Sequence, residues 1–171
     1  MNPARRPWRP GGAGLSPSVC MYGIAEHHQL RHQVTIGAQD LQADGFGPNP
    51  FYHCLLAELL PRPGELPGPP VGYALFFFGY SVNHGRLVYL ENLYVEAPYR
   101  GRGIGKTLLS EVAKVSLAHG CVEMKLMVME GNHRAAAFYQ GLGACDTTAD
   151  EGWHCVELGG LALHRLAGEE L

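Results

Sequence analysis

The sequence predicts an α/β fold in which a mixed sheet is flanked by helices. Two observations predict it. Short apolar runs of strand length alternate with segments of helical periodicity, and a glycine-rich loop joins one apolar run to an amphipathic helix. The chain has 171 residues, 46% of them hydrophobic and 17% charged, so it can bury the core of one compact domain.

The beginning of the chain differs from the rest. Four prolines and three glycines lie within the first twenty residues and interrupt any helical or strand periodicity. We therefore expect a disordered leader over residues 1–23 and a folded domain over residues 24–171. No continuous apolar stretch follows the arginines of the leader, which argues against a secretory signal and predicts a cytoplasmic protein.

Three strands are predicted before the glycine-rich loop. Residues 52–59 and 71–80 are apolar runs on either side of a Pro/Gly-rich turn region, and residues 86–95 form the third run. Because only five residues separate the second run from the third, these two are expected to form an antiparallel hairpin.

Helices and shorter strands follow the loop. Apolar residues from Ile104 onward recur at helical spacing until Gly120 provides a stop. Residues 121–129 predict a further strand, and Asn132 can cap a second helix. A last strand over residues 153–158 would complete the sheet.

Composition and charge exclude several classes of function. The longest apolar run, residues 71–80, is shorter than the about 20 residues that a membrane-spanning helix needs. The formal net charge is -3 with no basic stripe, so no nucleic-acid partner is expected. The five cysteines lack a C-x-x-C pair, and the histidine cluster at His27, His28 and His32 has no carboxylate or cysteine at ligand spacing. We therefore expect reduced thiols and no metal site.

The glycine-rich loop reads Arg-Gly-Arg-Gly-Ile-Gly over residues 100–105 and opens a helix. Unpaired N–H groups and the positive end of the helix dipole suit a phosphate or pyrophosphate there. The P-loop pattern requires glycine at the position of Arg100, and the dinucleotide fingerprint requires glycine at the position of Lys106. Both patterns fail, which leaves an R-x-x-G-x-G loop or an ordinary turn.

The R-x-x-G-x-G loop resembles the coenzyme A pyrophosphate loop of the GNAT acetyltransferases, and the later segment EGNHRAAAFYQGLGA stands in GNAT order. The segments DGFGPNPFYHC, YLENLYV and DEGWH are similar to the diamine acetyltransferases, which are the spermidine/spermine N-acetyltransferases, and especially to their thialysine-preferring second member. The resemblance runs from Ala25 to Gly168. It implies a GNAT acyl-CoA N-acyltransferase fold that lacks the family's first strand and helix, whose length the leader occupies.

The resemblance implies an N-acetyltransferase that transfers acetyl from acetyl-CoA to a small aliphatic amine by direct attack in a ternary complex. Glu91 matches the family's glutamate that contacts the amine and removes its proton, and Tyr139 matches the general acid that protonates the leaving thiolate. By themselves, the residues leave two other interpretations open: Glu91 as a solvent-facing strand carboxylate and Tyr139 as a core aromatic. A covalent acetyl-cysteine route is not favoured, since no cysteine lies in the glycine loop or beside Tyr139.

The resemblance also implies binding residues. Acetyl-CoA would contact the backbone of Leu93, Tyr94 and Val95, the pyrophosphate loop Arg100, Gly101, Arg102, Gly103, Ile104, Gly105 and Lys106, and the later positions Asn132, His133, Arg134, Ala135 and Tyr139. The amine would contact Glu91, Lys125, Leu126, Met127 and Glu151. For Lys125 to Met127 and for Glu151, ordinary strand core and a solvated turn remain the alternatives.

The chain departs from the family in ways that affect these expectations. Without the first strand and helix, an exposed sheet edge is expected. The segment EHHQLRHQV replaces aromatic and acidic residues, and Asn92 replaces an aspartate, which weakens recognition of a second ammonium group. Spermidine, small diamines and thialysine-like amino acids therefore remain candidate substrates. The resemblance implies a homodimer, and the rival hypothesis is a catalytically impaired variant that binds coenzyme A or protein partners without turnover.

Overall fold

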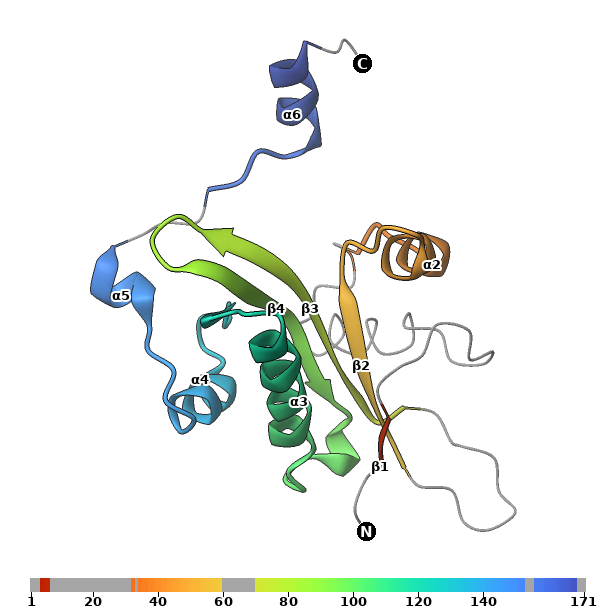
Figure 1. Cartoon of the computed structure of the whole chain (residues 1–171), viewed down its shortest axis with the longest axis vertical. Helices are drawn as coiled ribbons and strands as arrows, with labels where there is room; N and C mark the ends of the chain where they lie inside the picture. Colours follow the sequence, from red (N-terminus) through yellow and green to blue (C-terminus); the bar gives the residue numbers. More distant parts are fainter. Residues whose placement is uncertain (1–3, 7–31, 33, 60–69, 153–155, 169–171) are drawn as a thin grey trace. The chain divides into compact units, whose positions relative to one another are not determined.

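The computed structural model describes residues 4–6, 32, 34–59, 70–152 and 156–168 (Figure 1). The chain divides into two compact units, Met1–Met127 and Val128–Leu171. Within the described residues, the first unit contains one five-stranded sheet in the order β1-β2-β3-β4-β5. Its strands are β1 (Ala4–Arg6), β2 (His53–Glu58), β3 (Gly72–Ser81), β4 (Gly85–Val95) and β5 (Glu123–Leu126).

The sheet is mixed, as the sequence predicts. β1, β2, β3 and β4 pair with their neighbours in antiparallel orientation, and β5 is parallel to β4. The expected hairpin is confirmed, because β3 and β4 pair along their whole length from Gly72↔Val95 to Ser81↔Gly85. The parallel β4–β5 pair requires a crossover, which α3 (Ile104–Ala118) supplies after the short helix η2 (Ala97–Tyr99).

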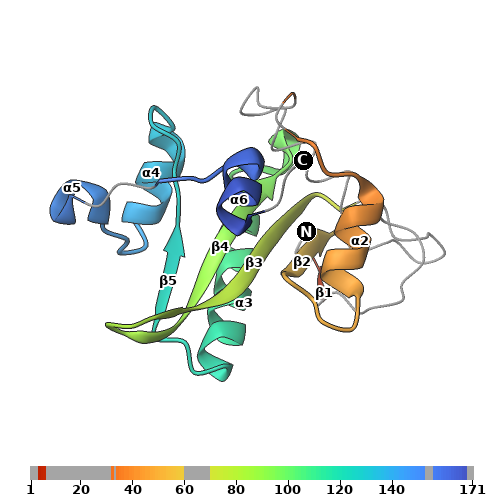
Figure 2. The same ribbon diagram turned by 90° about the horizontal axis from the view of Figure 1, so that it is seen from above.

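Helix α3 packs along one face of the sheet, where it contacts β2, β3 and β4 (Figures 1 and 2). Its buried residues Ile104, Leu108, Val112 and Ser116 repeat every four positions, which places them on one stripe of the helix. Ser116 can be buried because its hydroxyl donates to the carbonyl oxygen of Val112 at 2.7 Å.

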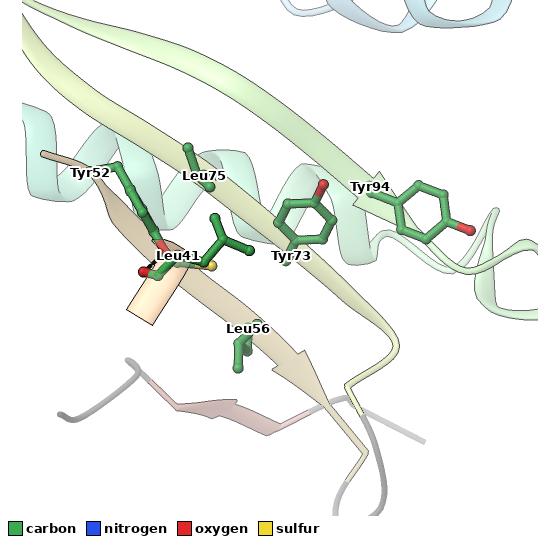
Figure 3. Packing of buried hydrophobic residues seen from close by; sticks show 7 residues of the cluster. Leu41, Tyr52, Leu56, Tyr73, Leu75 and Tyr94 are labelled. Atoms are coloured by element: carbon green, nitrogen blue, oxygen red, sulfur yellow. Dashed lines mark hydrogen bonds between the residues drawn. The ribbon is translucent and has the colours of Figure 1, made fainter. Parts of the chain in front are cut away.

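A second core cluster involves α2 (Ala38–Phe46), which the sequence pattern did not predict. Leu41 of α2 belongs to a buried cluster with residues of β2, β3 and β4 (Figure 3). The Tyr52 hydroxyl donates to the carbonyl oxygen of Leu41 at 2.6 Å. A Cβ at Gly45 would overlap the Tyr52 ring, so this helix position requires glycine. Only one residue of α2 is buried, which explains why its sequence lacks a clear apolar stripe.

The Tyr52 contact predicts a pH dependence of stability. Burial, with smaller effects of Cys54 and Asp44, raises the pKa of Tyr52 from 10.0 to about 12. The folded state thus favours the neutral phenol. The contribution of Tyr52 to the free energy of unfolding is complete below pH 10 and is lost as the pH rises through about 12. Tyr52→Phe should lower the free energy of unfolding by about 1 kcal/mol at pH 8, and this loss should become smaller near pH 11.

Urea unfolding at both pH values measures this difference. Tyr80→Phe is the matched control, because Tyr80 is 75% exposed. A deficit of Tyr52→Phe that stays constant from pH 8 to pH 11 would contradict the assignment.

The second unit contains three helices among its described residues: α4 (His133–Gln140), α5 (Thr147–Glu151) and α6 (Gly160–Ala167). Asn132 caps α4 as predicted, since its Oδ1 accepts from the backbone N–H of Ala135 at 3.1 Å. Helix α6 ends at Gly168, which adopts the left-handed conformation with φ +77°. The sequence reading did not anticipate α5 or α6.

Two predictions about elements are wrong. The leader was expected to contain no strand, but Ala4–Arg6 forms β1 and covers the edge of β2 from Leu56 to Glu58. Backbone pairing needs no side-chain periodicity, so three extended residues between two prolines suffice. Residues 156–158 form no strand, and Val156 is 91% exposed. The apolar residues of this segment therefore do not belong to the sheet. Residues 153–155 of that predicted strand, and the rest of the leader, lie outside the described residues.

The described residues also bear on the predicted strand that corresponds to β5, the cysteines, membrane spans and metal ligands. The strand predicted over residues 121–129 is observed as Glu123–Leu126 only. Cys54 and Cys121 are buried free thiols, whereas Cys145 is an exposed one. The described helices are all too short or too polar to cross a lipid bilayer. In the same residues, no three His, Cys, Asp or Glu side chains gather as metal ligands.

Candidate active site

The parallel ladder between β4 and β5 ends part-way along β4. Its register runs from Leu87↔Glu123 to Leu90↔Leu126, whereas β4 continues to Val95. Because β3 pairs with the other side of β4, residues 91–95 have one edge without a strand partner in the described part of the chain. Leu93, Tyr94 and Val95 lie along this open edge, where their backbone can pair with an extended amide-bearing chain.

A bulge in β4 marks the start of the open edge. The register with β3 shifts so that Phe76 pairs with Leu90 and Leu75 pairs with Asn92. Glu91 therefore lies outside the ladder, and its side chain is exposed. Bulges redirect side chains at functional sites, so the geometry presents one carboxylate where β4 and β5 separate.

The glycine loop follows the open edge and opens helix α3. Gly101 and Gly103 adopt φ values of +76° and +80°, which residues with a Cβ rarely adopt. The first α-helical bond of α3 joins the N–H of Thr107 to the carbonyl of Gly103 at 2.9 Å, and no side chain caps the helix. The preceding N–H groups, together with the helix dipole, are suited to a pyrophosphate.

Three cationic side chains belong to this loop. Arg100 is half-buried, whereas Arg102 and Lys106 are exposed. The Nε of Arg100 donates to the carbonyl oxygen of Val95 at 2.7 Å, and an Nη of Arg102 donates to that of Pro98 at 3.0 Å. Positive charge and free helix N–H groups thus coincide at one end of the open edge.

Besides Glu91, the predicted amine-site residues of the first unit lie at the end of β5. Lys125 forms an ion pair with Glu123, with 2.9 Å between Nζ and Oε1. The other carboxylate oxygen of Glu123 lies 2.9 Å from Nδ1 of His84. Leu126 is half-buried at the last ladder position, and Met127 is 70% exposed.

Glu123 is the ion-pair partner of the predicted site residue Lys125, and sequence reasoning missed this pair although a signal was available. Residues two apart on a strand share a face, so a strand over EMKL predicts that Glu123 and Lys125 are neighbours. The ion pair offsets the positive charge of Lys125. The bulge at Glu91 could not be seen in the sequence, because it depends on pairing with β3.

The remaining predicted residues belong to the second unit. Tyr139 is half-buried in α4, where burial raises the pKa of its phenol to about 12. At neutral pH it is therefore protonated and able to donate. Glu151 is exposed at the end of α5, and His133 and Arg134 are exposed in the first turn of α4. In the first unit, Glu91 and the open edge belong to β4, the loop follows β4, and Lys125 and Leu126 pair with the two β4 residues before Glu91. In the second unit, Asn132 to Ala135 form the start of α4 and Tyr139 lies later in the same helix.

Comparisons with known proteins identify the family. The family described as Acetyltransferase (GNAT) family matches residues 22–144. This chain belongs to the GNAT acetyltransferase family. The resemblance and the acetyltransferase class predicted from the sequence are thereby confirmed.

Individual GNAT relatives agree with this family. The thialysine N-epsilon-acetyltransferase of Bos taurus is 50% identical over 147 residues, which cover 85% of this chain and 86% of that protein. The human spermidine/spermine N(1)-acetyltransferase-like protein 1 is 35% identical over 147 residues, 86% of this chain and 21% of that one. A solved integron cassette protein from the mobile metagenome of V. cholerae has a TM-score of 0.64 at 20% identity, covering 86% of this chain and 87% of that chain. That likeness confirms the GNAT fold.

Proposed function

We propose that this GNAT protein transfers acetyl from acetyl-CoA to the primary amine of a small aliphatic amine, by direct attack in a ternary complex. The observation that carries the proposal is the open edge of β4, which leads from Glu91 directly into the loop at the N-terminus of α3. An edge for the pantetheine arm and an anion site for the pyrophosphate are thus consecutive in the chain. A non-catalytic coenzyme A-binding protein would need the same edge and loop, but not Glu91 and Tyr139.

Acetyl-CoA binding would use the residues of both units. The backbone of Leu93, Tyr94 and Val95 would pair with the pantetheine arm. The pyrophosphate would accept hydrogen bonds from the loop Gly101 to Lys106. The resemblance also assigns acetyl-CoA contacts to the start of α4 at Asn132 and to the phenol of Tyr139, which belong to the second unit.

Glu91 would act as the base. An alkylammonium has a pKa near 10, so it must lose a proton before its nitrogen can attack. Glu91 is an exposed carboxylate at the bulge and can accept that proton through water. The nitrogen then forms a bond to the thioester carbonyl carbon, and the carbon–sulfur bond breaks.

Tyr139 would complete the transfer. The leaving sulfur carries the electron pair of the broken bond and takes the phenolic proton of Tyr139, which yields a thiol and an amide. The raised pKa means that the phenol carries its proton at neutral pH. Exchange with solvent removes the proton from Glu91 and returns one to Tyr139, so the cycle balances.

The amine class is narrower than the family as a whole. Asn92 offers an amide where the resemblance implies an aspartate, so a second ammonium group would gain less attraction here. The relatives from Bos taurus and Mus musculus that are about half identical are named as thialysine acetyltransferases. We therefore favour an amine of the thialysine type over spermidine. Lys125, Leu126, Met127 and Glu151 would line its site.

The proposal also includes the remaining expectations from the sequence. The folded domain would extend over residues 24–171, with the strand β1 of residues 4–6 added to its sheet, in a cytoplasmic homodimer without a metal. The experiment that tests the function is turnover of acetyl-CoA by the whole chain with thialysine, lysine, putrescine and spermidine. Acetylation of thialysine is the expected result, and the absence of turnover on all four amines, with coenzyme A still bound, would favour the impaired variant.

Glu91→Gln tests the base. We expect kcat to fall about 100-fold at pH 7, in the usual range for loss of a general base. The defect should shrink as the pH rises toward 10, because a growing fraction of the amine is then already neutral. Rates of both proteins between pH 7 and pH 10 measure this. Glu111→Gln in α3, whose carboxylate pairs with Lys114 at 3.0 Å, is the control, and a defect that is independent of pH would argue against the role.

A further inference from the structure

The side chain of Arg100 contacts the last two residues of β4. Its Nε donates to the carbonyl oxygen of Val95 at 2.7 Å, and the bond is partly buried. Its guanidinium carbon lies 5.6 Å from the centre of the Tyr94 ring. A cation over an aromatic face is attracted to it, so the loop residue is held by two consecutive strand residues.

The carbonyl of Val95 points to the open edge. The N–H of Glu96 donates to the carbonyl of Val71 beside β3 at 2.9 Å. A trans peptide directs its C=O and N–H to opposite sides, and no peptide bond of the described chain is cis. The oxygen of Val95 therefore points away from β3, so Arg100 occupies the last acceptor of the edge that the pantetheine arm would use.

Tyr94 provides a firm anchor for this contact. Its ring is 9% exposed and belongs to the buried cluster, and its hydroxyl donates to Oε2 of Glu96 at 3.3 Å. Arg102 differs, because its contacts are with Pro98 and with the Tyr99 ring at 5.3 Å, both within η2. The contacts of Arg102 therefore connect the loop to η2, whereas those of Arg100 connect the loop to β4 of the sheet.

We propose that Arg100 is a positioning residue that sets the distance between the open edge of β4 and the anion site of the glycine loop. This inference rests on the proposed function, since the two regions need a fixed spacing only if one ligand spans both. The pantetheine arm then pairs with the edge before Val95 C=O, and the pyrophosphate begins beyond it. The hydrogen bond to Val95, rather than the positive charge of the side chain, positions the loop.

Two substitutions separate the bond from the charge. In Arg100→Gln, the amide nitrogen stands where Nε stood, so the donor to Val95 is kept and the charge is lost. In Arg100→Lys, the charge is kept and a methylene replaces the donor at that position. Arg102→Gln is the matched control, because it removes a charge of the same loop without touching β4.

The first measurement is hydrogen exchange of the amides of residues 93–96 in the protein without ligand. We expect faster exchange in Arg100→Lys and near-native exchange in Arg100→Gln and Arg102→Gln. Equal exchange in the parent protein and in Arg100→Lys would overturn the proposal. This comparison needs neither ligand nor turnover, so its outcome is separate from the failure of the proposed function.

The second measurement compares the affinities for coenzyme A and for pantetheine, which lacks the pyrophosphate. Loss of one charge-assisted hydrogen bond raises a dissociation constant by about 10- to 100-fold. Arg100→Lys should therefore lower the affinities for coenzyme A and for pantetheine by that factor. Arg100→Gln should bind pantetheine within about threefold of the parent protein. The opposite result would be a lowered affinity for coenzyme A in Arg100→Gln and an unchanged affinity in Arg100→Lys. It would show that the charge contacts the pyrophosphate directly, and it would refute the positioning role.

Discussion

Tyr139→Phe should lower kcat by at least about 100-fold, because it removes only the proton that the leaving sulfur takes. The ring, its packing against Phe138 and its place in α4 are retained, so stability should change little. Since the pKa of Tyr139 is about 12, its loss should lower the rate by a similar factor at every pH from 6 to 10.

Steady-state rates with a saturating amine measure this effect. Tyr80→Phe removes an exposed hydroxyl at the far end of β3 and serves as the control, with unchanged kcat. A rate for Tyr139→Phe within about threefold of the parent protein would exclude Tyr139 as the general acid and support the alternative of a core aromatic. The flat pH profile also distinguishes Tyr139→Phe from Glu91→Gln, whose defect should shrink at high pH.

Phe76→Ala should have the largest effect on stability. Phe76 is 1% exposed in the centre of β3, where it stacks on His53 at 5.5 Å and meets Phe78 edge to face at 6.1 Å. Removal of a buried phenyl ring leaves a cavity and costs about 3–5 kcal/mol. Because Phe76 pairs with Leu90 next to the bulge, collapse around that cavity should also disturb Glu91.

Urea unfolding followed by circular dichroism measures the loss. Tyr80→Ala on the same strand is the control and should change the free energy of unfolding by less than about 0.5 kcal/mol, because the side chain is 75% exposed. A loss below about 1 kcal/mol for Phe76→Ala would contradict the packing described here.

Much of the fold could be predicted from the sequence where local pattern and tertiary role coincide. The strands β2, β3 and β4 and the helix α3 are long, periodic and bounded by glycine or proline, and all four are observed. The helices α2, α5 and α6 were missed. Helix α2 buries only Leu41, so its sequence lacks the apolar stripe by which a helix is recognised, and α5 spans only Thr147–Glu151. Helix α6 does alternate apolar and polar sides, but none of its residues is buried.

The candidate site divides in the same way. The types and spacing of residues in the glycine loop predicted an anion site and, through resemblance, the acetyltransferase family, because loop conformation and helix capping are local properties. Three features depend instead on contacts between residues distant in sequence. These are the bulge at Glu91, the ion pair of Glu123 with Lys125, and the bond from Arg100 to Val95.

The sequence by itself determined the succession β2, β3, β4, α3, β5 and α4, the glycine loop and the family. Each depends on neighbours along the chain or on residue identity. Only the tertiary structure decided that β5 leaves β4 after Leu90, that β1 covers part of the edge of β2, and which side of β4 stays open. Those outcomes follow from backbone hydrogen bonds between strands, which every residue except proline can form, so no pattern of side chains records them.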